Sequence, residues 1–267
     1  MWSARLEFEL LRWRVAGHRA RLWWRDDDAT ERSAALFRLF SLSNSAAVPL
    51  TLAVIPSGDM AGLAKALAVG EQVTVAQHGV DHQNRRTGPV AGEFPQDWTR
   101  DAVKAKLSWG WDRVRALPGI MPVFVPPWND VHPELDAALV DLGFRALSAS
   151  GELQSGELVR LDVHLDLMRW RGGARFRGQR RFLRALFEAL RLRRRLRLWT
   201  APIGLLTHHL AHDEAAWKFL HEFLAWTERR TALGWVGLAS LLEGVESRAP
   251  TPYLPALALV SSSGRPN

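Results

Sequence analysis

Short apolar runs alternate with longer segments of helical periodicity along most of the chain. Apolar runs bounded by turn residues are typical of buried strands, and apolar positions three or four apart are typical of helices that cover a sheet. The runs predict strands at residues 21–25, 47–56, 72–76, 121–125, 145–148, 159–167 and 202–207. The periodic segments predict helices at residues 3–19, 30–42, 58–68, 97–117, 133–142, 169–197, 213–229 and 235–242. This alternation indicates an α/β fold built on parallel strands.

Titratable side chains follow three of the predicted strands. Residues 26–28, all aspartate, follow the first strand, His78 and His82 follow the third, and His208 and His209 follow the last. The carboxyl ends of parallel strands meet at one edge of a sheet, which is where α/β proteins build their sites. We therefore expect these clusters to converge.

The His78-x-x-x-His82 pair predicts a metal site. Two imidazoles four positions apart can face one point from a helix or a tight loop, and each offers a nitrogen lone pair. The chain contains no cysteine, so histidines and carboxylates are its only strong metal ligands. Two histidines and one aspartate leave coordination positions open for water and substrate, as in a catalytic site.

Length and composition predict one soluble domain. The chain has 267 residues, of which 47% are hydrophobic, enough for a core over residues 1–247. Residues 248–267 are rich in proline, and we expect a flexible tail there. Charged residues interrupt the amino-terminal segment, and no run is long and uncharged enough to cross a membrane, so we expect a cytoplasmic protein without a membrane span.

Four motifs in order resemble those of the polysaccharide deacetylases of carbohydrate esterase family four. They are Asp27-Asp28 before Ala29, His78-x-x-x-His82, Pro126-Pro127-Trp128 and Leu205-Leu206-Thr207-His208. The ordered set is more specific than any single motif. The resemblance implies a distorted (β/α) barrel with an incomplete ring of strands, and removal of an acetyl group from a sugar or related small molecule.

The resemblance also implies roles for individual residues. Asp28, His78 and His82 would bind a divalent metal, with zinc preferred, Asp27 would be the general base and His208 the general acid. The residues expected to contact the acetylated substrate are Pro127, Trp128, Asn129 and His209. Asp166 and Trp170 hint at the family's Asp/Trp segment.

Three positions leave alternatives open. The triple aspartate also allows residues 26–27 as base and ligand, and His209 is a second candidate for the acid. Val125 stands where the family has an arginine that orients the base, and Arg25 or Arg145 could substitute for it.

That departure supports a rival hypothesis, a catalytically inactive deacetylase-like domain that binds glycan or a polyanion. The formal charge is +7, and arginines are concentrated in residues 169–197, predicted as one amphipathic basic helix. Such a helix is more often an ordinary solvated surface than a site for nucleic acid or an anionic surface.

Overall fold

The computed structural model describes residues 4–150 and 157–246, so the predicted tail at 248–267 lies outside the described residues. The strands of its main sheet are β1 (Ala20–Ala29), β2 (Leu50–Val54), β3 (Val73–His78), β4 (Ile120–Val125), β5 (Ala146–Leu147), β6 (Val159–Arg160), β7 (Val163–Asp166), β10 (Ile203–Thr207) and β11 (Leu233–Trp235). A separate antiparallel pair contains β8 (Met168–Arg169) and β9 (Arg175–Phe176). The helices are α1 (Ala4–Val15), α2 (Ala34–Ala46), α3 (Met60–Leu67), α4 (Arg100–Val114), α5 (Leu135–Asp141), α6 (Gln179–Arg195), α7 (Glu214–Glu228) and α8 (Leu238–Glu246).

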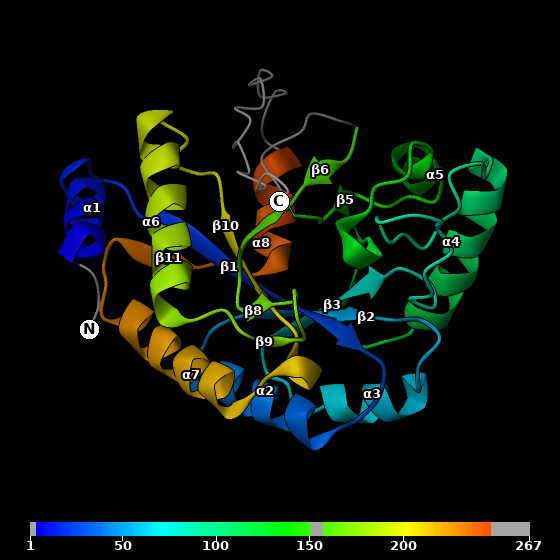
Figure 1. Cartoon of the computed structure of the whole chain (residues 1–267), viewed down its shortest axis with the longest axis horizontal. Helices are drawn as coiled ribbons and strands as arrows, with labels where there is room; N and C mark the ends of the chain where they lie inside the picture. The colour runs from blue at the N-terminus through cyan, green and yellow to red at the C-terminus, as the bar shows by residue number, and fades with distance from the viewer. Residues whose placement is uncertain (1–3, 151–156, 247–267) are drawn as a thin grey trace, which may run out of the picture.

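The main sheet is parallel and open. Its strands follow the order β6-β5-β4-β3-β2-β1-β10-β7, and β11 pairs with β1 outside this path. No ladder joins β6 to β7 among the strands in the described ranges, so the ring of strands is incomplete (Figure 1). The predicted incomplete (β/α) barrel is confirmed.

Strand β1 runs through the centre of the sheet. It pairs with β10 along its middle, with β11 at its start and with β2 at its end. Both faces of β1 are covered, which explains why Leu22, Trp23 and Trp24 are all buried instead of alternating with polar residues. The central strand therefore delivers the aspartate cluster into the interior of the domain.

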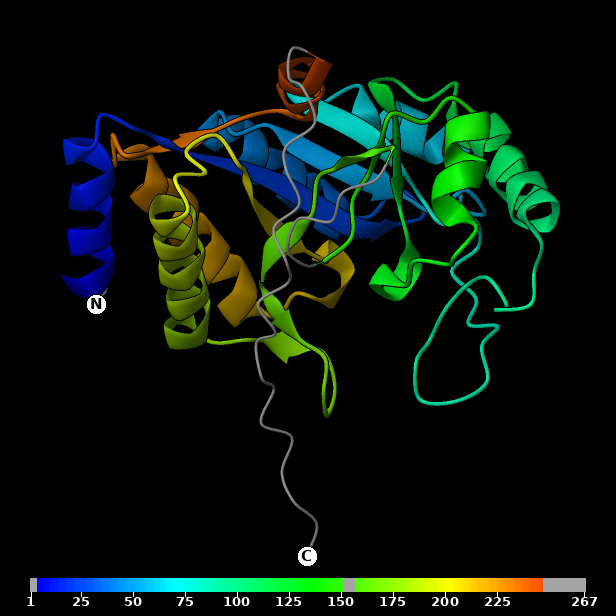
Figure 2. The same cartoon turned by 90° about the horizontal axis from the view of Figure 1, so that it is seen from above.

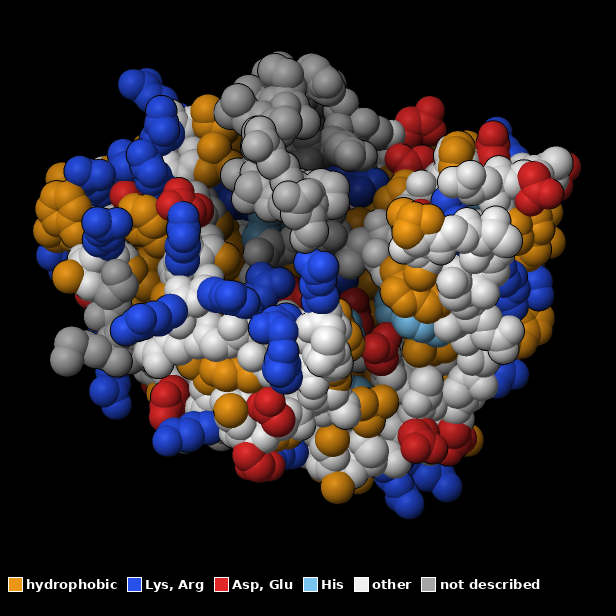
Figure 3. Space-filling view, in the orientation of Figure 1, with side chains coloured by type: hydrophobic (Ala, Val, Ile, Leu, Met, Phe, Trp, Pro, Cys, Tyr) orange, Lys and Arg blue, Asp and Glu red, His pale blue; other side chains and the backbone are white. Residues whose placement is uncertain are grey.

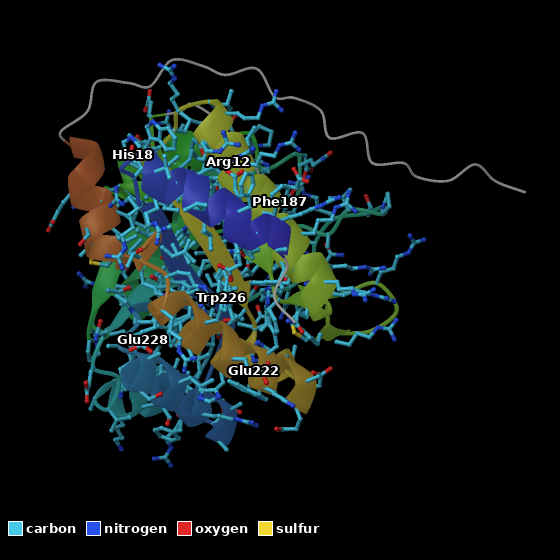
Figure 4. The ribbon with its side chains drawn as sticks, turned by 90° about the vertical axis from the view of Figure 1, so that its left-hand side faces the viewer. Arg12, His18, Phe187, Glu222, Trp226 and Glu228 are labelled. Carbon is cyan, nitrogen blue, oxygen red and sulfur yellow. The ribbon has the colours of Figure 1, made fainter. Side chains whose placement is uncertain are left out.

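Helices cover the outside of the curled sheet. Figure 1 shows α1 and α6 on one flank, α7, α2 and α3 along one edge, and α4 and α5 on the opposite flank. The view from above keeps the two flanks on opposite sides of the sheet (Figure 2). Figure 4 shows α1 lying against α6, where the Trp13 indole donates a hydrogen bond to the Leu190 carbonyl oxygen at 3.3 Å.

The inner side of the sheet packs on α8. Trp23, Val125 and Leu206 from β1, β4 and β10 share a buried cluster with Leu238 and Leu241 of that helix. This apolar cluster supports the strands whose carboxyl ends carry the titratable residues.

Two predicted helices were wrong in extent. The segment 169–197 begins with β8 and β9, and α6 starts only at Gln179. Gly172, Gly173 and Gly178 all have positive φ angles, which a helix cannot contain. The segment 235–242 begins with the last residue of β11, and its helix starts at Leu238. None of the helices in the described part of the chain is long and apolar enough to cross a membrane.

Candidate metal centre and active site

The carboxyl end of β1 carries the three aspartates in different environments. The pairing with β2 shifts register between Asp26 and Ala29, and Asp28 has a φ of 69°. This irregularity breaks the alternation of side chains that a regular strand imposes. Asp26 is completely buried and Asp27 is 4% exposed, whereas Asp28 is partly accessible.

The two histidines of the metal motif lie at the end of β3 and in the loop that follows. His78 ends the strand, and Gly79 and His82 have φ angles of 55° and 54°. A Cβ on Gly79 would lie 2.4 Å from the Pro127 ring, so only glycine fits there. The loop thus folds back tightly enough for both imidazoles to face Asp28.

Asp28, His78 and His82 bring three ligand atoms within 4.8 Å of one another. Asp28 Oδ1 lies 3.1 Å from His78 Nε2 and 3.3 Å from His82 Nε2. His78 Nδ1 lies 3.0 Å from the Val125 carbonyl oxygen and therefore carries a proton, so Nε2, which faces Asp28, is the nitrogen available to a metal. Two imidazoles and one carboxylate converging in this way fit a divalent cation such as zinc.

The electrostatics of the cluster suit a cation. Burial opposes the charge on His78, but Asp27 and the hydrogen bond to Asp28 raise its pKa overall. Burial and the charge of His78 lower the pKa of His82. Burial would raise the pKa of Asp28, yet the hydrogen bond and charges of the neighbouring histidines hold it far below its ordinary value. A cation would take the place of the proton that Asp28 draws onto His78.

Asp27 lies beside this cluster and is paired with Arg25. The arginine Nε is 2.8 Å from Asp27 Oδ1, and its Nη2 donates to Oδ2 at 2.9 Å. Val125 stands where the family has an arginine, and the sequence offered Arg25 and Arg145 as replacements for that arginine. In the structure, Arg25 is the one that contacts Asp27.

Asp26 and His209 form a separate buried pair. Asp26 Oδ1 is 2.5 Å from His209 Nδ1, and its Oδ2 accepts hydrogen bonds from Thr207 Oγ1 and from the His209 backbone N–H. His209 is only 1% exposed. This corrects the expectation that His209 contacts substrate, because its side chain turns into the interior. It also separates Asp26 from the three metal-competent residues.

His208 is 9% exposed, more than the 1% of His209, and its ring faces Trp170. The Trp170 ring meets the His208 ring edge-on, with centroids 4.5 Å apart. The Trp170 indole donates to Asp166 Oδ2 at 3.1 Å, and burial raises the pKa of Asp166. Asp166 and Trp170, which the sequence suggested as the family's Asp/Trp segment, therefore lie next to His208.

The Pro-Trp turn after β4 places one aromatic on the surface. Trp128 is 41% exposed with a φ of 54°, and its ring centroid lies 4.3 Å from that of His82. Pro127 is buried against Gly79, and Asn129 Oδ1 lies 3.5 Å from Arg25 Nη2. Of the residues predicted in this turn to contact substrate, Trp128 is the one with an exposed side chain at the site.

Sequence reasoning missed Glu93. This buried carboxylate accepts hydrogen bonds from the backbone N–H groups of Val80, Asp81 and His82, at 2.7 to 3.0 Å. It holds the metal-motif loop from the far side. The only signal was an acidic residue in a polar loop, because contacts to backbone leave no side-chain pattern.

No protein-family model and no curated protein matches this sequence. Solved structures do match. A protein from Mycobacterium smegmatis assigned as a polysaccharide deacetylase has 16% identity and a TM-score of 0.66, over 90% of this chain and 96% of that one. A family 4 carbohydrate esterase from Streptomyces lividans in complex with acetate has 13% identity and a TM-score of 0.53, over 81% and 91%.

A mutant of a family-four pseudoenzyme with restored enzymatic activity also matches, with 15% identity and a TM-score of 0.52, over 84% of this chain and 68% of that one. The chain has the fold of the family-four carbohydrate esterases and polysaccharide deacetylases. At these identities the likeness establishes the fold, and function has to be argued from the site.

Proposed function

We propose that this protein is a metal-dependent hydrolase that removes an acetyl group from a sugar or related small molecule. The observation that carries the proposal is the convergence of Asp28, His78 and His82 on one point beside Asp27. These three residues would hold a divalent cation, preferably zinc. When bound, the cation supplies positive charge that polarises the acyl oxygen and makes water more acidic.

The remaining residues would move protons. Arg25 holds the Asp27 carboxylate but leaves some of its lone pairs free. Asp27 uses one of these lone pairs to accept a proton from the attacking water. His208 Nδ1 is buried and has no hydrogen-bond partner in the part of the chain that the structure describes, so Nε2 is the nitrogen that can reach the substrate. We assign to it donation of a proton to the departing amine or alkoxide.

Two exposed tryptophans support a sugar substrate. Trp128 lies against His82 and Trp170 against His208, so an indole flanks each side of the proposed chemistry. Their exposed fractions are 41% and 46%. Indole faces combine apolar area with low conformational cost and stack on sugar rings.

Metal analysis and acetate release test the proposal together. The purified chain should contain a divalent cation and release acetate from members of a panel of N- and O-acetylated sugars. Asp28→Ala and His78→Ala should lose both the cation and the activity, whereas His221→Ala, on the exposed side of α7, should keep both. Acetate release that survives complete loss of the cation would contradict the proposal.

The arginines of α6 favour the second candidate, an inactive domain that binds a polyanion. Only Glu188 is acidic in that helix. Binding to a polyanion that weakens steeply with salt, together with no acetate release from any acetylated sugar, would favour this candidate.

A further inference from the structure

The short antiparallel ribbon formed by β8 and β9 places two arginines directly opposite each other. Arg169 pairs with Arg175 in the register of the ribbon, and Met168 pairs with Phe176. The side chains of directly opposed residues lie on the same face, and like charges there destabilise the pair. This ribbon therefore carries an electrostatic cost that its fold does not require.

Both guanidinium groups converge on the glycine turn. A Cβ on Gly172 would lie 3.8 Å from Nη2 of Arg175 and 3.9 Å from Nη2 of Arg169. The Arg169 Nε also donates to the Arg171 carbonyl oxygen at 3.3 Å. Within the described ranges, no carboxylate lies within ion-pair distance of these three arginines. Two guanidinium groups without a carboxylate partner therefore meet over one turn, and their planar N–H donors match the geometry of an oxyanion.

The ribbon lies beside the proposed active site. Trp170 directly follows Arg169, and its ring contacts His208, the proposed acid. Figure 3 shows basic side chains gathered over β8 and β9, next to a hollow in which acidic and histidine side chains are visible. An anion bound by the arginines would thus belong to a molecule that also reaches the site.

We propose that the acylated substrate carries a carboxylate or phosphate group, which Arg169 and Arg175 bind while its ring packs near Trp170. This inference rests on the proposed hydrolase function and names the substrate class of the same site. The planar guanidinium groups each offer paired donors to such an oxyanion. The anion would also relieve the repulsion between the two arginines.

Matched substrates test the inference. The probes are N-acetylglucosamine, its 6-phosphate and the corresponding 6-carboxylate, so the two anion types are distinguished. We expect kcat/KM for acetate release to be about ten- to a hundredfold higher for at least one anionic probe than for the neutral one. In the double variant Arg169→Gln/Arg175→Gln this preference should disappear, chiefly through KM. The control is Arg191→Gln, an exposed arginine of α6.

Two further measurements keep the inference separate from the proposed function. Calorimetry with inorganic phosphate, on the full chain with and without its divalent cation, should show binding that the double variant loses in both states. The double variant should unfold at the same temperature as the wild type or higher, because a repulsive pair is removed. These measurements need no turnover.

The outcomes are distinct. If no probe releases acetate but phosphate binding depends on both arginines, the hydrolase proposal is contradicted and the anion site is supported. Equal kcat/KM on neutral and anionic probes, or phosphate binding that is unchanged in the double variant, would overturn the anion site.

Discussion

Arg25 binds Asp27 at two points, with Nε 2.8 Å from Oδ1 and Nη2 2.9 Å from Oδ2. The two residues are two positions apart on β1 and share one face of the strand. Arg25 is completely buried, and its Nη1 donates to the carbonyl and hydroxyl oxygens of Ser148. The guanidinium is therefore fixed, and it fixes the plane of the carboxylate that we propose as the base.

Arg25→Lys should slow acetate release while the metal content stays the same. Lysine keeps the positive charge but cannot form the two-point contact with Asp27. We expect kcat/KM to fall about ten- to a hundredfold, corresponding to the loss of one oriented charge-assisted contact. Steady-state kinetics and metal analysis on the same preparation measure the two effects separately.

The matched control is Arg145→Lys, since Arg145 was the other arginine that the sequence offered for this role. Its activity should stay near that of the wild type. A fall in activity with Arg145→Lys but not with Arg25→Lys would show that the orienting arginine has been misassigned.

The sequence predicted the architecture because its apolar runs are well separated and end in titratable residues. Parallel strands then bring His78 and Asp28 to one edge by topology alone, although they are 50 residues apart. The mistake at residues 169–197 has a local cause. Arginine and apolar residues continue at helical spacing there, but Gly172 and Gly173 adopt positive φ angles and interrupt the helix.

The finer assignments depended on partners that no local pattern reveals. Our choice of Asp27, Asp28 and His208 relies on the buried Asp26–His209 pair, whose members are 183 residues apart. The sequence favours Asp27-Asp28 because Ala29 follows them, and the structure adds that Asp26 and His209 are buried against each other. Glu93 could not be predicted for a similar reason, because it contacts backbone N–H groups.

Glu93→Gln should weaken metal binding without removing any metal ligand. The carboxylate accepts three backbone N–H groups in the loop that carries His82, and an amide replaces one accepting oxygen with a donor. Mutation of residues that position metal ligands typically lowers metal affinity by about ten- to a hundredfold. Competition with a chelator measures this affinity, and Glu222→Gln on α7 is the exposed control. Equal affinity in both variants would exclude a positioning role for Glu93.

His208→Gln and His209→Gln should separate activity from stability. We expect His208→Gln to lower kcat/KM by about a hundred- to ten-thousandfold, since a general acid is lost, with little change in the free energy of unfolding. His209→Gln should lower the free energy of unfolding by about 3 kcal/mol, because it leaves Asp26 buried without its partner. Chemical denaturation and acetate release on both variants give the comparison, and the reverse pattern would reassign the acid to His209.

His212 gives the fold a dependence on pH through a residue to which we assign no part in the proposed chemistry. It lies beyond β10 with its ring edge-on to Trp217, the centroids 4.5 Å apart. Burial lowers its pKa to about 4, and Asp26 and Asp213 only partly oppose this effect. Neither ring nitrogen has a hydrogen-bond partner among residues 4–150 and 157–246, so the charged form has little to stabilise it.

His212→Gln should therefore reduce the loss of stability in mild acid. The unfolded chain binds a proton at His212 below its ordinary pKa of about 6.5, whereas the folded chain binds it only near pH 4. Between these values the unfolded state holds more protons, so the free energy of unfolding falls as the pH falls, by up to about 2 kcal/mol from pH 7 to pH 5. Urea denaturation of both proteins across this range measures the difference in the free energy of unfolding. The metal-site residues titrate in both proteins, so their contribution cancels in this difference. Parallel curves for the two proteins would show that His212 titrates alike in the folded and unfolded states.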